Sequence, residues 1–191
     1  MALTTLDPRT ALVVIDLQKG IAAVPAAHPV DEIVQRAASL ATAFRRHGLP
    51  VVLVSVTGGA PGRTEASRPA FAPSPESTEL LDELAPQPGD HLVTKHRRSA
   101  FHGTSLDARL QDLGVTQVVL AGISTTAGVE PTARSAYDHG YHVVLATDAM
   151  TDTDADAHRG AVERIFPRLG ETATSTEIIE MLDEPDDPGV R

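Results

Sequence analysis

The chain has 191 residues, no cysteine, 3% aromatic residues and a formal net charge of −10. This length suits one domain with a sizeable core, and the lack of cysteine excludes disulfide bonds and thiolate catalysis. The acidic charge argues against nucleic-acid binding, because phosphate contacts require a basic face. No apolar stretch approaches the roughly 18 residues of a membrane span, and no signal peptide is visible, so we expect no membrane association and a cytoplasmic location.

Strand-like and helix-like segments alternate along the first half of the chain. Continuous apolar runs predict strands that are buried on both faces, and apolar residues at helical spacing predict a helix that Gly48 ends. A long Gly/Pro/Ser-rich segment predicts a lid or an interface loop. The predicted elements are, in order, a strand at 11–15, a helix at 30–44, a strand at 51–56, the loop at 57–77, a short helix at 79–84 and a strand at 91–94.

The second half repeats the same order of strand and helix. We expect helix caps at Ser105, Thr126, Thr153 (with Asp156) and Thr174 (with Glu177), and strands at 117–121 and 142–146. The pattern predicts an α/β fold: a single doubly wound, mostly parallel sheet of about six strands with helices on both faces, a Rossmann-like three-layer sandwich. We expect one domain over 1–191, with its core at about 10–182 and a frayed acidic tail at 184–191.

Three segments place polar groups at the carboxyl ends of predicted strands, where ligands of open parallel sheets bind. Asp16 ends the first strand, Lys95 follows the strand at 91–94, and the turn 122–128 leaves a central strand. Asp16 is either a turn cap or a catalytic carboxylate, because burial at the mouth of an apolar pocket raises a carboxyl pKa towards neutrality. Lys95 is either a solvated surface lysine or the charge partner of Asp16.

Four segments in this order resemble the isochorismatase-like hydrolases over about residues 11–182. They are Asp16-Leu17-Gln18, Lys95 with Ser99-Ala100-Phe101, the run from Gly122 to Arg134, and Asp148-Ala149-Met150 before an acidic, histidine-containing helix. The resemblance implies an Asp–Lys–Cys triad in most members. Asp16 and Lys95 match its first two positions, and Gly128 stands at the position of the nucleophile. The resemblance also implies a cis peptide near Ile123-Ser124 and a homo-oligomer, dimer or tetramer.

A second departure from the resembled family concerns metal. Nicotinamidases of the family carry an Asp-x-His-x-His zinc motif, and the equivalent stretch 55–59 has no such ligands, so we expect no metal and no cofactor. His102, near Lys95, either lines the pocket or lies on the surface. We interpret the other candidate histidines as surface or packing residues: His28, His91, His96, His142 and His158.

Glycine at the nucleophile position leaves three hypotheses open. The first is a cysteine-independent hydrolase that uses Asp16 as acid or base on a small carbonyl or vinyl-ether metabolite. The resemblance implies that isochorismatases cleave a vinyl ether without a thiol, for which Asp16 would be the acid, and Lys95 with Arg63 or Arg68 would hold substrate carboxylates. The second is a catalytically silent member that binds a small molecule or a protein partner. The third is an amidase that uses a hydroxyl of residues 124–126.

Two further expectations concern how a small-molecule substrate would be held. The amides at the helix start near Thr126 are expected to face the pocket, where they would bind an anion or an oxyanion. The residues that we expect to contact the substrate are Gln18, Arg63, Phe101, His102, Ser124 and Thr125.

Overall fold

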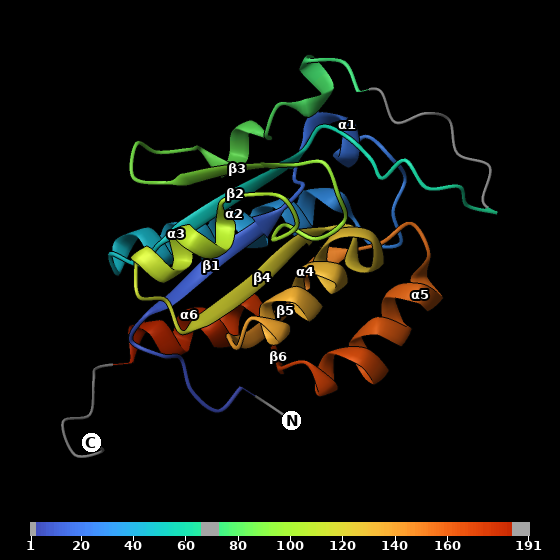
Figure 1. Ribbon diagram of the computed structural model, residues 1–191. Helices are drawn as coiled ribbons and strands as arrows, with labels where there is room; N and C mark the ends of the chain where they lie inside the picture. Colours follow the sequence, from blue (N-terminus) through green and yellow to red (C-terminus); the bar gives the residue numbers. More distant parts are fainter. Residues whose placement is uncertain (1–2, 66–72, 185–191) are drawn as a thin grey trace.

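The computed structural model describes residues 3–65 and 73–184. Arg68 and most of the tail that we expected to fray therefore lie outside the described residues. The described part forms one six-stranded sheet in the order β3-β2-β1-β4-β5-β6, with every neighbouring pair parallel (Figure 1). The predicted doubly wound parallel sheet is confirmed. Its strands are β1 (Thr10–Ile15), β2 (Val51–Val56), β3 (His91–Lys95), β4 (Gln117–Ile123), β5 (His142–Thr151) and β6 (Glu171–Ala173).

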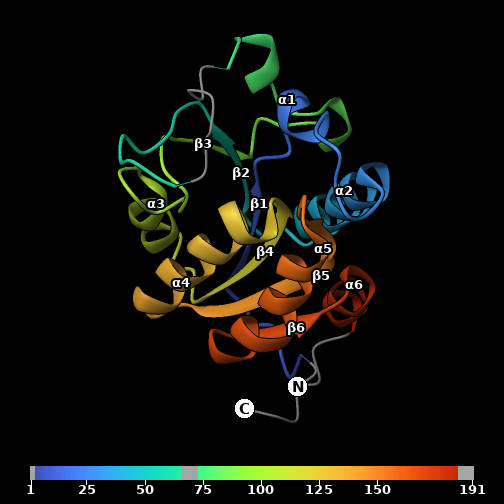
Figure 2. The ribbon, with the colours of Figure 1, turned by 90° about the vertical axis from the view of Figure 1, so that its right-hand side faces the viewer.

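Helices cover both faces of the sheet, as Figure 2 shows for α3 and α4 on one side and for α2 and α6 on the other. Because side chains alternate along a strand, Val13 and Ile15 of β1 pack towards α3 and α4, whereas Leu12 and Val14 pack towards α2 and α6. All six residues of β1 are buried, which explains its uninterrupted apolar run. The helices are α1 (Lys19–Ala22), α2 (Val30–Arg46), α3 (Leu106–Asp112), α4 (Glu130–Asp138), α5 (Ala155–Gly160) and α6 (Ser175–Asp183).

Several element boundaries differ from the sequence-based prediction. Two single 3₁₀ turns, Glu76–Thr78 and Asp82–Leu84, replace the short helix at 79–84. The segment between them is extended because Leu80 bridges to Gln18. The helix expected to begin at the Thr153 cap instead comprises α5, a π-helical turn and a final 3₁₀ turn. Its N-cap is Asp154, whose carboxylate accepts hydrogen bonds from the amides of residues 156 and 157, so the cap predicted at Thr153 is wrong.

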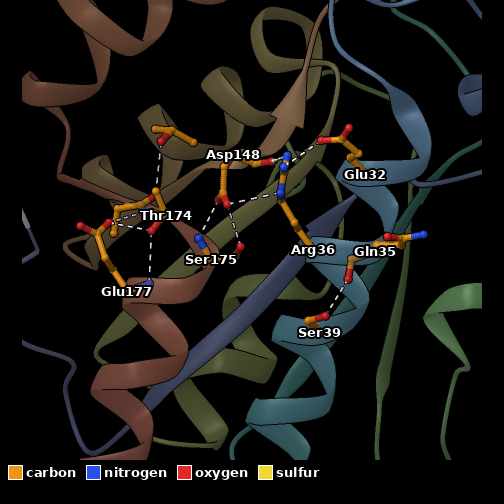
Figure 3. A network of polar contacts seen from close by, with 10 residues as sticks. Glu32, Gln35, Arg36, Ser39, Asp148, Thr174, Ser175 and Glu177 are labelled. Carbon is orange, nitrogen blue, oxygen red and sulfur yellow. Dashed lines mark hydrogen bonds and ion pairs between the residues drawn. The ribbon is translucent and has the colours of Figure 1, made fainter.

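A polar network fastens α2 and α6 to β5 (Figure 3). The Asp148 carboxylate accepts hydrogen bonds from the Ser175 amide at 2.6 Å and from the Ser175 hydroxyl at 2.8 Å, and Arg36 donates to the Asp148 carbonyl at 3.0 Å. The predicted capping box of Thr174 and Glu177 is confirmed beside it. Asp148 therefore caps α6 and also anchors α2. Among the described residues, no helix is long and apolar enough to cross a membrane.

Candidate functional site

Asp16 lies at the carboxyl end of β1, in a left-handed backbone conformation with φ of 53°. The residue is 5% exposed, and its Oδ2 lies 2.8 Å from Lys95 Nζ. Its Oδ1 is buried and has no hydrogen-bond partner among the described residues. Burial raises the pKa of the carboxyl to about 6, and the nearby Lys95 ammonium, which lowers it, only partly offsets that effect. Asp16 is therefore a buried carboxyl of which one oxygen is paired with Lys95 and the other forms no hydrogen bond within the described residues.

Lys95 ends β3 and reaches past the end of β2 to Asp16. The residue is 1% exposed, so the interpretation as a solvated surface lysine is wrong. Besides its ion pair with Asp16, its Nζ donates a hydrogen bond to the Arg98 carbonyl at 2.8 Å. The ammonium is therefore held by one charged partner and one neutral partner, and its position is fixed by the chain that follows β3.

Gly128 lies in a π-helical turn, η3 (Thr125–Val129), between β4 and α4. The turn follows a cis peptide bond at Ile123-Ser124, where the family resemblance implied one. A Cβ at position 128 would lie 3.3 Å from Asp16 Oδ2 and 2.9 Å from Ile15 Cγ2. The structure thus brings Asp16, Lys95 and Gly128 together, and it leaves little space for a side chain at position 128.

The amides at the start of this turn are already hydrogen-bonded. The Thr126 amide donates to Asp152 Oδ2 at 2.7 Å, the Ala127 amide to Ser124 Oγ at 3.3 Å, and the Gly128 amide to the Ser124 carbonyl at 2.9 Å. The expectation that they bind an anion or an oxyanion is therefore wrong for this conformation. The cap predicted at Thr126 is wrong as well, because Ser124 is the N-cap and the Thr126 hydroxyl donates to Asp152 instead.

Gln18 follows β1 and is hydrogen-bonded to the end of β2. Its Nε2 donates to the carbonyls of Val56 at 3.2 Å and Thr78 at 2.8 Å, and its Oε1 accepts from the Val56 amide at 2.8 Å. The residue is 1% exposed. Both amide hydrogens are thus used within the protein, and the predicted substrate contact must be corrected to a role in holding β1 against β2.

Two of the remaining predicted contacts are buried and two lie on the surface. The Phe101 ring packs in the core and stacks on His139 at 5.1 Å, beyond the C-terminal end of α4 and thus at the opposite end of that helix from the η3 turn. Its predicted substrate contact is therefore also corrected to core packing. Thr125 is completely buried. His102 and Arg63 are exposed.

His158 is a site neighbour that the sequence did not indicate. Its Nδ1 lies 2.8 Å from the Thr125 hydroxyl, and its ring contacts that of His28 at 4.7 Å. Burial and the adjacent His28 lower the pKa of His158. Within residues 3–65 and 73–184, no group of three or more His, Cys, Asp or Glu side chains is arranged to hold a metal ion.

The comparisons with known proteins agree on one family. A family model described as the isochorismatase domain matches residues 10–177. The chain belongs to the isochorismatase family of hydrolases. It is 40% identical over 184 residues to an uncharacterized isochorismatase family protein of Escherichia coli O157:H7, YecD, covering 91% of this chain and 96% of the relative.

Solved structures of related sequence have the same fold. An isochorismatase family protein from Burkholderia thailandensis superposes with a TM-score of 0.91 at 39% identity, covering 94% of this chain and 98% of that one. N-carbamoylsarcosine amidase from Thermoplasma acidophilum superposes with a TM-score of 0.74 at 28% identity, covering 93% and 99%.

Introducing a thiol at position 128 of this family member tests how closely the site is packed. We expect Gly128→Cys to lower the free energy of unfolding by about 1–3 kcal/mol, because the new Cβ overlaps Ile15 Cγ2. Because the nearby amides are occupied, we also expect no amide hydrolysis. The control is Gly160→Cys, at a helical glycine with no atom near the new Cβ. Urea denaturation of both variants checks the expectation, which equal losses would contradict.

Proposed function

We propose that this protein hydrolyses a small vinyl-ether carboxylate by acid catalysis at Asp16, without a covalent intermediate. The single observation that carries the proposal is the Asp16 carboxyl, which is buried, has an unpartnered Oδ1 and has its pKa raised to about 6. A general acid works best when its pKa lies near the operating pH, and roughly a tenth of such a carboxyl is protonated at pH 7.

The reaction balances with one proton and one water molecule. Protonated Asp16 transfers its proton to the terminal carbon of the vinyl ether, which leaves an oxocarbenium ion on the adjacent carbon. Water adds to that carbon and loses a proton, and the resulting hemiketal collapses to a keto acid and an alcohol. None of these steps requires a nucleophilic side chain, which agrees with glycine at position 128 and with the occupied amides of the η3 turn.

Exposed arginines on the segments that follow β2 and β3 support an anionic substrate. Arg98 is exposed and forms no ion pair with an acidic side chain in the described part of the chain, and its carbonyl accepts the Lys95 hydrogen bond at 2.8 Å. Arg63 is exposed on the segment that follows β2. A carboxylate held by these groups would offset the Lys95 charge and raise the pKa of Asp16 further, which favours the acid form.

The amidase alternative has one observation in its favour and one against it. Thr125 has a neutral imidazole beside it that is able to accept a proton. Its hydroxyl lies 2.8 Å from His158 Nδ1, and burial lowers the pKa of that imidazole. The amides that would stabilise the oxyanion of an acylation step are however occupied, by Asp152 Oδ2, the Ser124 hydroxyl and the Ser124 carbonyl. The occupied amides therefore favour acid catalysis at Asp16 over a threonine nucleophile.

The test follows the transferred proton. Purified protein is offered a panel of vinyl-ether carboxylates, including isochorismate, in D₂O, and the keto acid is reduced at once to the hydroxy acid so that its methyl group cannot exchange. We expect one deuterium in that methyl group, detected by mass spectrometry. Release of an unlabelled product, or turnover of amides alone, would refute the proposed function, and a panel member that binds unchanged would support the silent alternative.

A further inference from the structure

The Asp152 carboxylate binds the turn that packs against Asp16. Asp152 directly follows β5 and is 5% exposed. Its Oδ2 accepts hydrogen bonds from both the Thr126 amide and the Thr126 hydroxyl, each at 2.7 Å. Its Oδ1 accepts from the Thr153 amide at 2.8 Å. Although burial raises the pKa of Asp152, these hydrogen bonds outweigh that effect and lower it, so the group stays anionic.

We propose that Asp152 is a positioning residue: through Thr126 it holds the η3 turn closed against the Asp16 carboxyl and so keeps water away from that carboxyl. Asp152 does more than cap a helix, because the turn that it holds carries Gly128. At that glycine a Cβ would lie only 3.3 Å from Asp16 Oδ2.

A second contact holds the same turn from the same side. Thr125, the residue before Thr126, lies with its hydroxyl 2.8 Å from Nδ1 of His158 on α5. The segment that precedes α2 supports this side in turn, because the Ala27 amide donates to the Asp152 carbonyl at 2.8 Å. Asp152, in the connection from β5 to α5, and His158, in α5, therefore hold two successive residues of the turn. Neither residue belongs to the Asp16–Lys95 pair.

The consequence for Asp16 follows from what sets its acidity. Burial is the cause that raises the pKa of Asp16, and the charged group that acts on it is Lys95, which lowers it. If the turn is released, water reaches the carboxyl and the raising effect weakens, while Lys95 continues to act. The pKa of Asp16 should then fall towards its ordinary value. A loss of stability elsewhere in the fold would leave this pKa unchanged in the molecules that remain folded.

The experiment measures the pKa of Asp16 in the intact protein without any substrate. The ¹³Cγ resonance of Asp16 is followed by NMR from pH 3 to 9 in protein labelled at aspartate, and the spectrum of Asp16→Asn assigns it. We expect Asp152→Ala to lower the pKa of Asp16 by about one unit. We expect Asp152→Asn, which removes the charge but keeps an oxygen acceptor for Thr126, to restore most of the wild-type value.

The matched control is Asp148→Ala. Asp148 lies in β5 and caps α6 through Ser175, as Asp152 caps the η3 turn through Thr126, but its contacts are with α2 and α6 (Figure 3). The Asp148→Ala protein should be less stable than the wild type, and the pKa of Asp16 in it should be unchanged. If Asp152→Ala does not fold, Thr126→Val, which preserves size and charge and removes the hydroxyl donor, should give a smaller fall in the same direction.

Two results would overturn the inference. Equal falls in Asp152→Asn and Asp152→Ala would mean that the charge of Asp152, and not its hydrogen bonds, acts on Asp16. An unchanged pKa in Asp152→Ala would mean that the turn stays closed without this contact, and an unchanged pKa in Thr126→Val would mean that the hydroxyl bond to Asp152 does not hold the turn. The functional meaning of the inference rests on the proposed function, in which Asp16 is the acid. Because the titration uses no substrate, failure of the inference and failure of the deuterium test are separate outcomes.

Discussion

Replacing Asp16 by asparagine is expected to reduce turnover of the vinyl-ether substrate by about a thousandfold, the usual scale of general-acid catalysis. Asparagine has nearly the same size, and its oxygen can still accept a hydrogen bond from Lys95, which in the wild type lies 2.8 Å from the carboxyl. It cannot deliver a proton to carbon. The measurement is the initial rate of keto-acid release at saturating substrate, compared with the wild type in the same buffer.

A second buried acid provides the control for this substitution. Asp90 pairs with Arg45 at 2.7 Å, and its side chain is 3% exposed, but the pair joins α2 to the turn before β3 rather than the candidate site. Asp90→Asn should reduce stability and leave the rate per folded molecule unchanged. Wild-type turnover in Asp16→Asn, or an equal loss in Asp90→Asn, would exclude Asp16 as the acid.

The Asp16 carboxyl also determines whether activity and stability rise or fall with pH. The protonated form is the active one, so kcat/KM should be constant well below pH 6 and should fall about tenfold per pH unit above it. Stability should follow the same direction. The pKa in the folded state, about 6, is raised above the ordinary 3.8, so the contribution of Asp16 is complete below pH 3.8 and is lost as pH rises through about 6. The difference between these two pKa values corresponds to a loss of about 3 kcal/mol in the free energy of unfolding. The Asp16→Asn protein should not show this loss.

The parallel sheet could be predicted from the sequence because its strands are buried on both faces. The run 11–15 is uninterruptedly apolar for that reason, and the predicted bounds of β2, 51–56, match the structure. The sixth strand could not be assigned in this way. Residues 171–173 form a short edge strand that pairs only with β5, and their sequence is polar enough to look like a loop. The cap at Thr174 was predictable because its capping box with Glu177 is a specific local pattern, whereas the caps at Asp154 and Ser124 were assigned to neighbouring threonines.

The parts of the candidate site that lie at strand ends could be predicted from the sequence. The parts that depend on hydrogen bonds between residues far apart in the chain could not. Asp16 and Lys95 could be placed because the carboxyl ends of parallel strands meet at one edge of the sheet. The role of Gln18 could not, because its partner carbonyls lie 38 and 60 residues away along the chain. Asp152 likewise binds an amide 26 residues earlier. No local pattern distinguishes such a carboxylate from the neighbouring acids at the start of α5.

Gly122→Ala is expected to destabilise the protein by about 3 kcal/mol or more, the largest loss of stability that we predict for a single methyl group. Gly122 has φ of 122°, which side-chain-bearing residues rarely adopt, and a Cβ there would lie 2.0 Å from the Ile15 carbonyl oxygen. That oxygen belongs to the backbone of β1, immediately before Asp16, so it cannot move without shifting the strand. The substitution therefore forces β1 and β4 apart directly beneath the candidate site.

Gly140→Ala separates the cost of steric overlap from the cost of the positive φ. Gly140 also has a positive φ, of 89°, but no atom lies within 4 Å of where its Cβ would be. Its substitution should therefore lower the free energy of unfolding by only about 1 kcal/mol. Urea denaturation of both variants measures the difference, and similar losses would show that strain in φ, rather than contact with Ile15, sets the effect. A larger loss at Gly122 would mean that the glycine is required for β4 to approach β1 closely enough to bring the η3 turn against Asp16.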